Sequence, residues 1–202
     1  MKTRKITITN QEIGFKEALD MTEELGGNQG LNKKENLRLR LLTEELIGMV
    51  RGVTEEASAD YWVEQNDHHY VLHLEADVKL NRKMREQILT MSSSGENVAA
   101  KGFMGKLKEM VAVAFLPDEY GNTLLSDFSL GLMSIASNTG PQAQQASAKA
   151  FNWSLQRYKA AVEEGISDNK FELEHSIVAS LADDVVVSVT GSHVEVMIDK
   201  TF

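Results

Sequence analysis

One stretch of the sequence, residues 36–53 (NLRLRLLTEELIGMVRGV), carries an uninterrupted helical pattern. Large apolar residues recur there at steps of three and four, which predicts a helix buried on much of its circumference. They are Leu39, Leu42, Leu46, Met49 and Val53 in one stripe, with Leu37, Leu41 and Val50 widening it. Such a helix needs other elements around it, so this stretch constrains the fold more than any other. Glu44 and Glu45 lie in its middle, either as solvated charges or as part of a site at the edge of the core.

The rest of the chain alternates strand patterns with helix patterns. Thr9 or Asn10 is expected to cap a first helix that ends at Gly26. The order predicts an α+β fold, a two-layer sandwich in which helices cover one face of a mixed, mainly antiparallel sheet. We expect one domain over residues 1–202. Alternating apolar residues predict strands at 4–9, 59–65, 70–77, 185–189 and 194–198. The polar turn Asn66-Asp67-His68-His69 is expected to join the second of these to the third, and Gly191-Ser192 to join the last two as a hairpin. Helical periodicity predicts helices at 81–91, 102–114 and 167–181, the last with Leu173, Ile177 and Leu181 facing inward.

A further helix is predicted from Pro141, because proline is common at the first helical position. Its apolar stripe consists of Phe151, Leu155, Tyr158 and Val162, and Gly165 ends it. The aromatic residues of this segment, Trp153 among them, either pack on the domain or form a surface for a protein partner or a homodimer.

The composition excludes several classes of function. The formal net charge is -9, so we expect no nucleic-acid partner. The sequence has no cysteine, which excludes thiolate chemistry and fits the reducing cytoplasm, where we expect the protein to act. No apolar run is long enough to span a bilayer, so we expect no membrane partner. His68, His69 and His73 lack the accompanying ligand spacing of a metal site, and no metal site is predicted.

Four stretches of the sequence contain motifs that can be compared with those of known protein families. They are residues 39–50 with Glu44-Glu45-Leu46, the strand ending in Glu75-Ala76-Asp77, the loop at 95–105, and the closing strand that begins Asp183-Asp184-Val185. Together with the order of elements, they resemble the histidine-kinase-like ATPase (GHKL) superfamily, and within it the bacterial anti-sigma-factor serine kinases. The resemblance extends over residues 5–114 and 183–200. It implies the histidine-kinase-like ATPase fold, with residues 115–182 as a helical insertion.

The resemblance also implies roles for individual residues. Glu45 matches the family's general base, and Asp77 matches the aspartate that receives the adenine amino group. ATP or ADP is therefore the implied cofactor. Glycines before a helix start let backbone N–H groups approach a phosphate, and lysine adds positive charge. The residues of the lid and glycine-rich box that match such a site are Gly95, Lys101, Gly102 and Gly105.

The sequence departs from the family pattern at the metal site. Met49 stands where the family has the asparagine that helps to hold magnesium. A thioether is a poor ligand for a hard cation that prefers oxygen. Lys79 and Asn81 replace glycines that follow the adenine-binding aspartate. These departures argue against magnesium binding and against efficient phosphoryl transfer.

We therefore expect an adenine-nucleotide-binding regulatory protein with degenerate kinase or ATPase motifs, which acts through a protein partner. One alternative is an active protein-serine kinase or ATPase of the anti-sigma-factor type, so enzymatic activity stays open at this point. The other alternative is a protein-interaction module that binds no nucleotide and uses the segment that begins at Pro141.

Overall fold

The computed structural model describes residues 1–50, 58–77, 150–164, 176–190 and 192–202, and these form an α+β fold. The predicted helices at 81–91 and 102–114, and the start of the helix at Pro141, lie outside these residues. None of the helices in the described ranges is long and apolar enough to cross a bilayer. In chain order, the described elements are β1 (Ile6–Thr9), α1 (Phe15–Asn28), α2 (Lys33–Gly48), β2 (Ser58–Asn66), β3 (His69–Asp77), β4 (Ala150–Ser154), α6 (Leu155–Glu163), α8 (Ile177–Leu181), β5 (Asp184–Thr190) and β6 (His193–Thr201).

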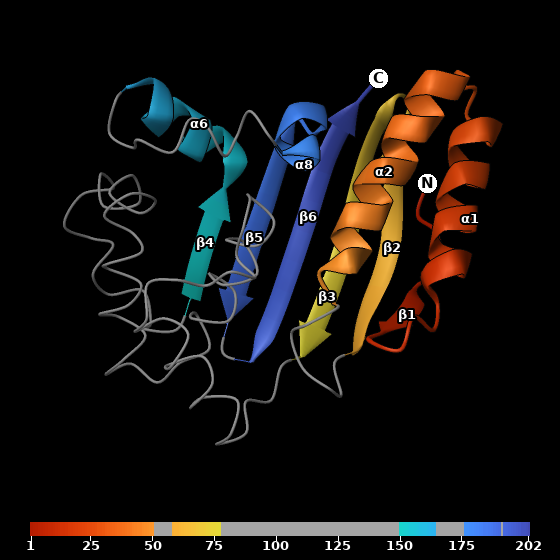
Figure 1. Ribbon diagram of the computed structural model, residues 1–202, viewed down its shortest axis with the longest axis horizontal. Helices are drawn as coiled ribbons and strands as arrows, with labels where there is room; N and C mark the ends of the chain where they lie inside the picture. Colours follow the sequence, from red (N-terminus) through yellow and green to blue (C-terminus); the bar gives the residue numbers. More distant parts are fainter. Residues whose placement is uncertain (51–57, 78–149, 165–175, 191) are drawn as a thin grey trace.

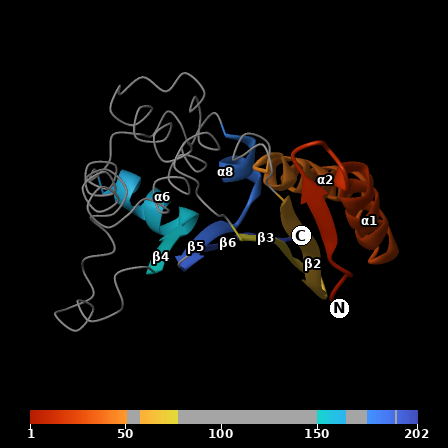
Figure 2. The same cartoon turned by 90° about the horizontal axis from the view of Figure 1, so that it is seen from below.

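The strands form one open six-stranded sheet in the order β1-β2-β3-β6-β5-β4. Every neighbouring pair is antiparallel, so the sheet is antiparallel throughout the described strands rather than mixed. The predicted pairings of β2 with β3 and of β5 with β6 are confirmed. All the described helices lie on one face of the sheet (Figures 1 and 2). The opposite face carries none of the described helices, and we name it the open face.

The local sequence determines where α2 begins and which side it buries. The Asn32 side chain accepts hydrogen bonds from the backbone N–H groups of Lys34 and Glu35, and the Glu35 carboxylate accepts one from the backbone N–H of Asn32. The predicted stripe is confirmed at Leu39, Leu42, Leu46 and Met49, which are all buried. The prediction for Leu37 is wrong, because this residue lies on the opposite side of the helix from Leu39 and is 55% exposed.

Strand residues that face the helices alternate with residues on the open face. The inward set joins the buried side of α2 in one hydrophobic core. Because a slip of one residue in pairing would turn this set to the open face, burial of one face specifies the register of the sheet. The inward set is Ile6, Ile8, Tyr61, Val63, Leu72, Leu74, Val185, Val187, Val189, Val194, Val196 and Ile198.

A buried hydroxyl cluster connects the sheet to both long helices. The Tyr61 hydroxyl of β2 lies 2.8 Å from the Thr22 hydroxyl of α1 and 3.0 Å from the Thr43 hydroxyl of α2. Each threonine hydroxyl also contacts a carbonyl of its own helix, at Ala18 for Thr22 and at Leu39 for Thr43. Burial raises the pKa of Tyr61, so the phenol keeps its proton and acts as a donor within this cluster.

The predicted helix from Pro141 is wrong at residues 150–154, and the proposed helical insertion therefore contributes a strand to the sheet. Residues 150–154 form β4, which pairs with β5. Helix α6 begins at Leu155, where the Ser154 hydroxyl accepts a hydrogen bond from the backbone N–H of Arg157. Trp153 and Tyr158 are buried in the core, with ring centroids 6.0 Å apart. The sequence signal was a change of period, from two before Ser154 to three and four after it.

The last helix differs from its predicted extent and facing. Among the described residues it starts at Ile177, after the Ser176 hydroxyl accepts a hydrogen bond from the backbone N–H of Ala179. Ile177 was expected to face inward, but it is 48% exposed. The next two residues, Val178 and Ala179, are buried instead. The short helix α8 therefore meets the core on a side different from the predicted one.

Asp183 connects the start of β5 to the end of β6. Its carboxylate accepts hydrogen bonds from Lys200 Nζ at 2.7 Å and from the backbone N–H of Thr201 at 2.6 Å. Burial alone would raise the pKa of Asp183, but the bonds from Lys200 and Thr201 outweigh it, so the pKa is lowered. The resulting stabilisation is present above the ordinary carboxyl value of 3.8 and is lost as pH falls through the lowered pKa.

Asp183→Asn is expected to lower the free energy of unfolding by less than about 1 kcal/mol at neutral pH, since solvent screens this ion pair. The Asp183 side chain is 40% exposed, which limits the effect. The difference between the variant and the parent should shrink as pH falls from 3.8 through the lowered pKa, because Asp183 is protonated first in the unfolded parent and then in the folded parent. Urea unfolding across this pH range measures it. A difference that grows toward acid pH would contradict the role of the charge.

Candidate functional site

The open face of the sheet gathers polar and titratable side chains from neighbouring strands. The strand register aligns them in rows across the sheet. The central row is Trp62, His73, Met197 and Val186. One flanking row contains the carboxylates of Asp60, Glu75 and Glu195, and the other contains those of Glu64, Asp199 and Asp184. The open face therefore has an aromatic and apolar centre between two acidic margins.

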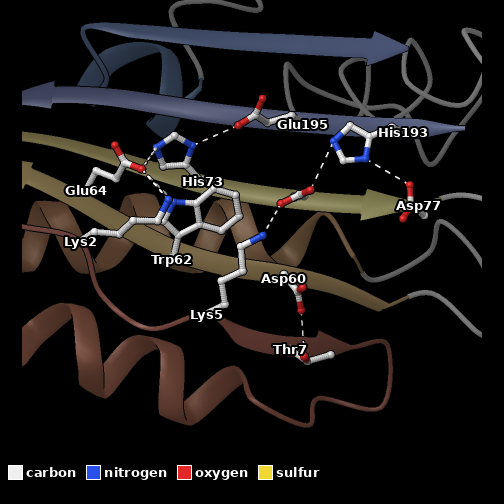
Figure 3. Close-up of polar contacts among 11 residues, drawn as sticks. Lys2, Lys5, Thr7, Asp60, Trp62, Glu64, His73, Asp77, His193 and Glu195 are labelled. Carbon is white, nitrogen blue, oxygen red and sulfur yellow. Dashed lines mark hydrogen bonds and ion pairs between the residues drawn. The ribbon is translucent and has the colours of Figure 1, made fainter. Parts of the chain in front are cut away.

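Trp62 and His73 form the middle of this face (Figure 3). Their rings stack with centroids 4.6 Å apart and planes 7° from parallel. Although both side chains point away from the core, Trp62 is only 5% exposed and His73 only 8% exposed. The ammonium groups of Lys5 and Lys2 lie over the Trp62 ring, 4.2 Å and 4.9 Å from its centroid. Two cations from the N-terminal segment thus cover the indole on the open face.

Each of these lysines also meets a carboxylate. Lys5 Nζ lies 2.6 Å from Glu75, and this bond raises the pKa of the Lys5 ammonium. Lys2 Nζ lies 2.9 Å from Glu64, and its bond lowers the pKa of the Glu64 carboxyl, with the Trp62 indole N–H adding to the effect. The ammonium groups of Lys2 and Lys5 therefore each contact both the Trp62 ring and a carboxylate.

His73 lies between two carboxylates. Its Nδ1 is 3.2 Å from Glu195, and because a carboxylate only accepts hydrogen bonds, Nδ1 carries the proton of this bond. Its Nε2 is buried and has no hydrogen-bond partner among the described residues. The nearest acid, Glu64 Oε1, lies 4.0 Å from Nε2. When the His73 ring carries its proton on Nδ1, Nε2 and Glu64 Oε1 are both hydrogen-bond acceptors, and no donor among the described residues bonds to both of them.

Two more histidines on this side also pair with acids. His193 lies 3.1 Å from Asp77 through Nδ1 and 3.5 Å from Glu75 through Nε2 (Figure 3). His69 Nε2 lies 2.8 Å from Asp199. The two acids of His193 lie on opposite ring nitrogens, so they do not converge on a common position where a metal ion could bind. No group of histidine and carboxylate side chains in the described ranges has the arrangement needed to hold a metal ion.

The structure does not bring the predicted site residues together. Glu45 is half-buried on α2, in the helical layer. Asp77 is exposed at the end of β3, and its side chain contacts His193 on the open face (Figure 3). The predicted phosphate-binding residues Gly95, Lys101, Gly102 and Gly105 lie outside the described residues. The roles assigned to these residues stay predictions.

The stack of Trp62 on His73 was not predicted from the sequence, although the sequence contains a signal for it. The turn between β2 and β3 contains only Asp67 and His68, because Asn66 pairs with His69. Asp67 has a φ of 54°, the left-handed conformation that two-residue hairpin turns require. From that pair, counting outward sets Trp62 opposite His73. The predicted turn at Asn66-Asp67-His68-His69 is confirmed, and the register that follows from it pairs Trp62 with His73.

Comparison with protein-family models, with curated proteins and with solved structures finds no match for this chain.

Proposed function

We propose that this chain is an adenine-nucleotide-binding regulatory protein of the histidine-kinase-like ATPase fold, and that it acts through a protein partner. The placement of α2 on the sheet is the observation that carries the proposal. Helix α2 contacts both β3 and β6, and α2 and β3 end at the same edge of the sheet (Figure 1). Glu45 near the end of α2 and Asp77 at the end of β3 therefore lie toward the same end of the sheet, although Glu45 belongs to the helical layer and the Asp77 side chain contacts His193 on the open face.

The surroundings of Asp77 are consistent with a ligand at this edge. Its side chain is 73% exposed, so an adenine amino group has access to the carboxylate. The contact with His193 holds the Asp77 carboxylate toward the open face. To bind a ligand on the helical side, the Asp77 side chain has to rotate around the end of β3. ATP or ADP is the nucleotide that we propose.

The position of Met49 supports regulation rather than turnover. Its side chain is buried in the hydrophobic core directly after α2, so it offers nothing to a metal ion. We propose that the nucleotide binds without magnesium at this position. Active protein-serine kinase or ATPase chemistry is the alternative, and turnover that falls in Glu45→Gln would favour it. The absence of cysteine supports the cytoplasm as the location.

Asp77→Asn is expected to abolish ATP and ADP binding while leaving the fold intact. The exposed amide keeps an oxygen that can accept a hydrogen bond from His193 but loses the charge and the acceptor geometry for adenine. Calorimetric titration with each nucleotide, with and without magnesium, measures the effect. Asp67→Asn is the matched control, because it makes the same change at the other end of the β2–β3 hairpin. If nucleotide binding survives in Asp77→Asn, the assignment of the adenine site is wrong.

A further inference from the structure

The open face contains a set of aromatic and acidic side chains that bind lysine ammonium groups. Trp62 and His73 could point to solvent on such a face, but both are buried: their rings stack on each other, and Lys2 and Lys5 lie over the indole. The cations that cover the indole, Lys2 and Lys5, are exposed residues of the N-terminal segment. Their ammonium groups use two kinds of contact at once, an aromatic ring and a carboxylate. The open face therefore already binds lysine side chains, supplied by its own chain.

The charge of this face selects the same kind of ligand. Carboxylates border the central row on both sides, at Glu75 and Glu195 on one side and at Glu64 and Asp199 on the other. The whole chain has a formal net charge of -9, so its field also favours a basic partner. A second copy that docked through the same face would bring like charges together. Nucleic acid would meet the same repulsion.

Among the described residues, one buried acceptor on this face has no donor. His73 Nε2 is buried without a hydrogen-bond partner among the described residues. With the ring proton on Nδ1, toward Glu195, Nε2 presents a lone pair 4.0 Å from Glu64 Oε1. One ammonium or guanidinium group that replaced Lys2 would donate to both atoms. The donor groups of lysine and arginine match this pair.

We infer that the open face binds a basic segment of a protein partner. Lysine or arginine side chains of that segment take the places over Trp62 that Lys2 and Lys5 hold in the free protein. The N-terminal lysines are thus competitors for the partner, and the acidic rows attract it. This inference rests on the proposed function for the existence of a protein partner, but not for nucleotide binding.

The experiment uses an octalysine peptide as the probe, added to the full chain without nucleotide. Nuclear magnetic resonance follows the indole N–H signals, since Trp62 on the open face and Trp153 in the core are the two tryptophans of the sequence. We expect the Trp62 signal to shift on titration and the Trp153 signal to stay. Binding should weaken as salt is added, because the contacts lie at the surface. A peptide of glutamates should leave both signals unchanged.

Competition is tested by removing the cations of the chain. Lys2→Ala with Lys5→Ala is expected to tighten octalysine binding by about fivefold, the range expected when a cation–π contact becomes free for a ligand. Lys33→Ala with Lys34→Ala is the matched control, since it removes the same charge from exposed positions at the start of α2. Equal tightening by both pairs would show an effect of net charge alone and would overturn the inference.

The acidic margins are tested separately. Glu75→Gln with Glu195→Gln is expected to weaken octalysine binding by about tenfold, whereas Glu24→Gln with Glu44→Gln, on the exposed sides of α1 and α2, should change it less than about twofold. Equal weakening by both pairs, or no shift of the Trp62 signal, would also overturn the inference. So would dimerisation of the Lys2→Ala, Lys5→Ala variant in place of peptide binding. A failed nucleotide titration with normal octalysine binding would instead count against the proposed function alone.

Discussion

Replacing Gly14 by alanine is expected to destabilise the protein by about 3 kcal/mol, from left-handed strain together with a steric overlap. Gly14 precedes α1 with a φ of 81°, a conformation that an alanine side chain disfavours. A Cβ atom at Gly14 would overlap the carbonyl oxygen of Thr7 in β1 and lie 3.2 Å from methyl groups of Ile6 and Ile8. Because the overlap is with backbone, the strand or the helix start has to move.

Gly30→Ala is the matched control for this prediction. Gly30 has the same φ of 81°, but a Cβ atom there would have no heavy atom within 4 Å. The control carries the left-handed strain, partly offset by the lower entropy of the unfolded alanine chain, and should cost about 1 kcal/mol. Urea unfolding of both variants separates strain from overlap. Equal losses for Gly14→Ala and Gly30→Ala would show that the close approach of Gly14 to β1 does not matter.

The same turn shows what local sequence rules miss. Thr9 or Asn10 was expected to cap the first helix, but the residue before α1 is Gly14, and no side chain caps the helix start. The chain between β1 and α1 instead uses left-handed conformations at Glu12, with a φ of 66°, and at Gly14. The glycine marked this turn in the sequence. A left-handed glutamate has no such marker, because only tertiary contacts favour that conformation.

Strands and their facing were predictable where one face is buried. Leu72 and Leu74 alternate with His73 and Glu75, and the structure places the first pair in the core and the second on the open face. Burial enforces this alternation, so the pattern is visible in the sequence. The closing hairpin of β5 and β6 followed from the same rule.

Short elements at the sheet edge were harder to predict. The stripe through Leu155 and Tyr158 is truly helical, but the pattern was extended backward through Trp153, which lies in β4. A strand of five residues offers two or three alternations, and these also fit a helix. The pairing of β4 with β5, which decides the matter, depends on residues far apart in the chain.

The candidate site depends on such distant pairings even more. Trp62 is on β2, His73 on β3 and Glu195 on β6, and none of them belongs to a local motif. The roles of Glu45 and Asp77 rest on a resemblance and stay predictions, whereas the clustered side chains of the open face became visible only with the sheet order. Register, rather than composition, determines which polar groups meet there.

Tyr61→Phe is expected to lower the free energy of unfolding by about 1 to 2 kcal/mol, the size typical of lost buried hydrogen bonds. The Tyr61 hydroxyl is completely buried between Thr22 and Thr43, so the loss weakens the attachment of α1 and α2 to the sheet. The loss stays moderate because each threonine hydroxyl keeps its own helix carbonyl as acceptor. No donor is left unpaired by the change.

Tyr70→Phe makes the same substitution on the neighbouring strand, and we expect the opposite result. The Tyr70 hydroxyl is buried with no hydrogen-bond partner among the described residues, and burial raises its pKa. Removing it relieves a desolvation cost, so the variant should be as stable as the parent or more stable by up to about 1 kcal/mol. The ring keeps its edge contact with Phe202, at 5.8 Å between centroids. Urea unfolding of both variants tests the pair. Equal losses would mean that hydroxyl burial, rather than the cluster with Thr22 and Thr43, determines the contribution of Tyr61.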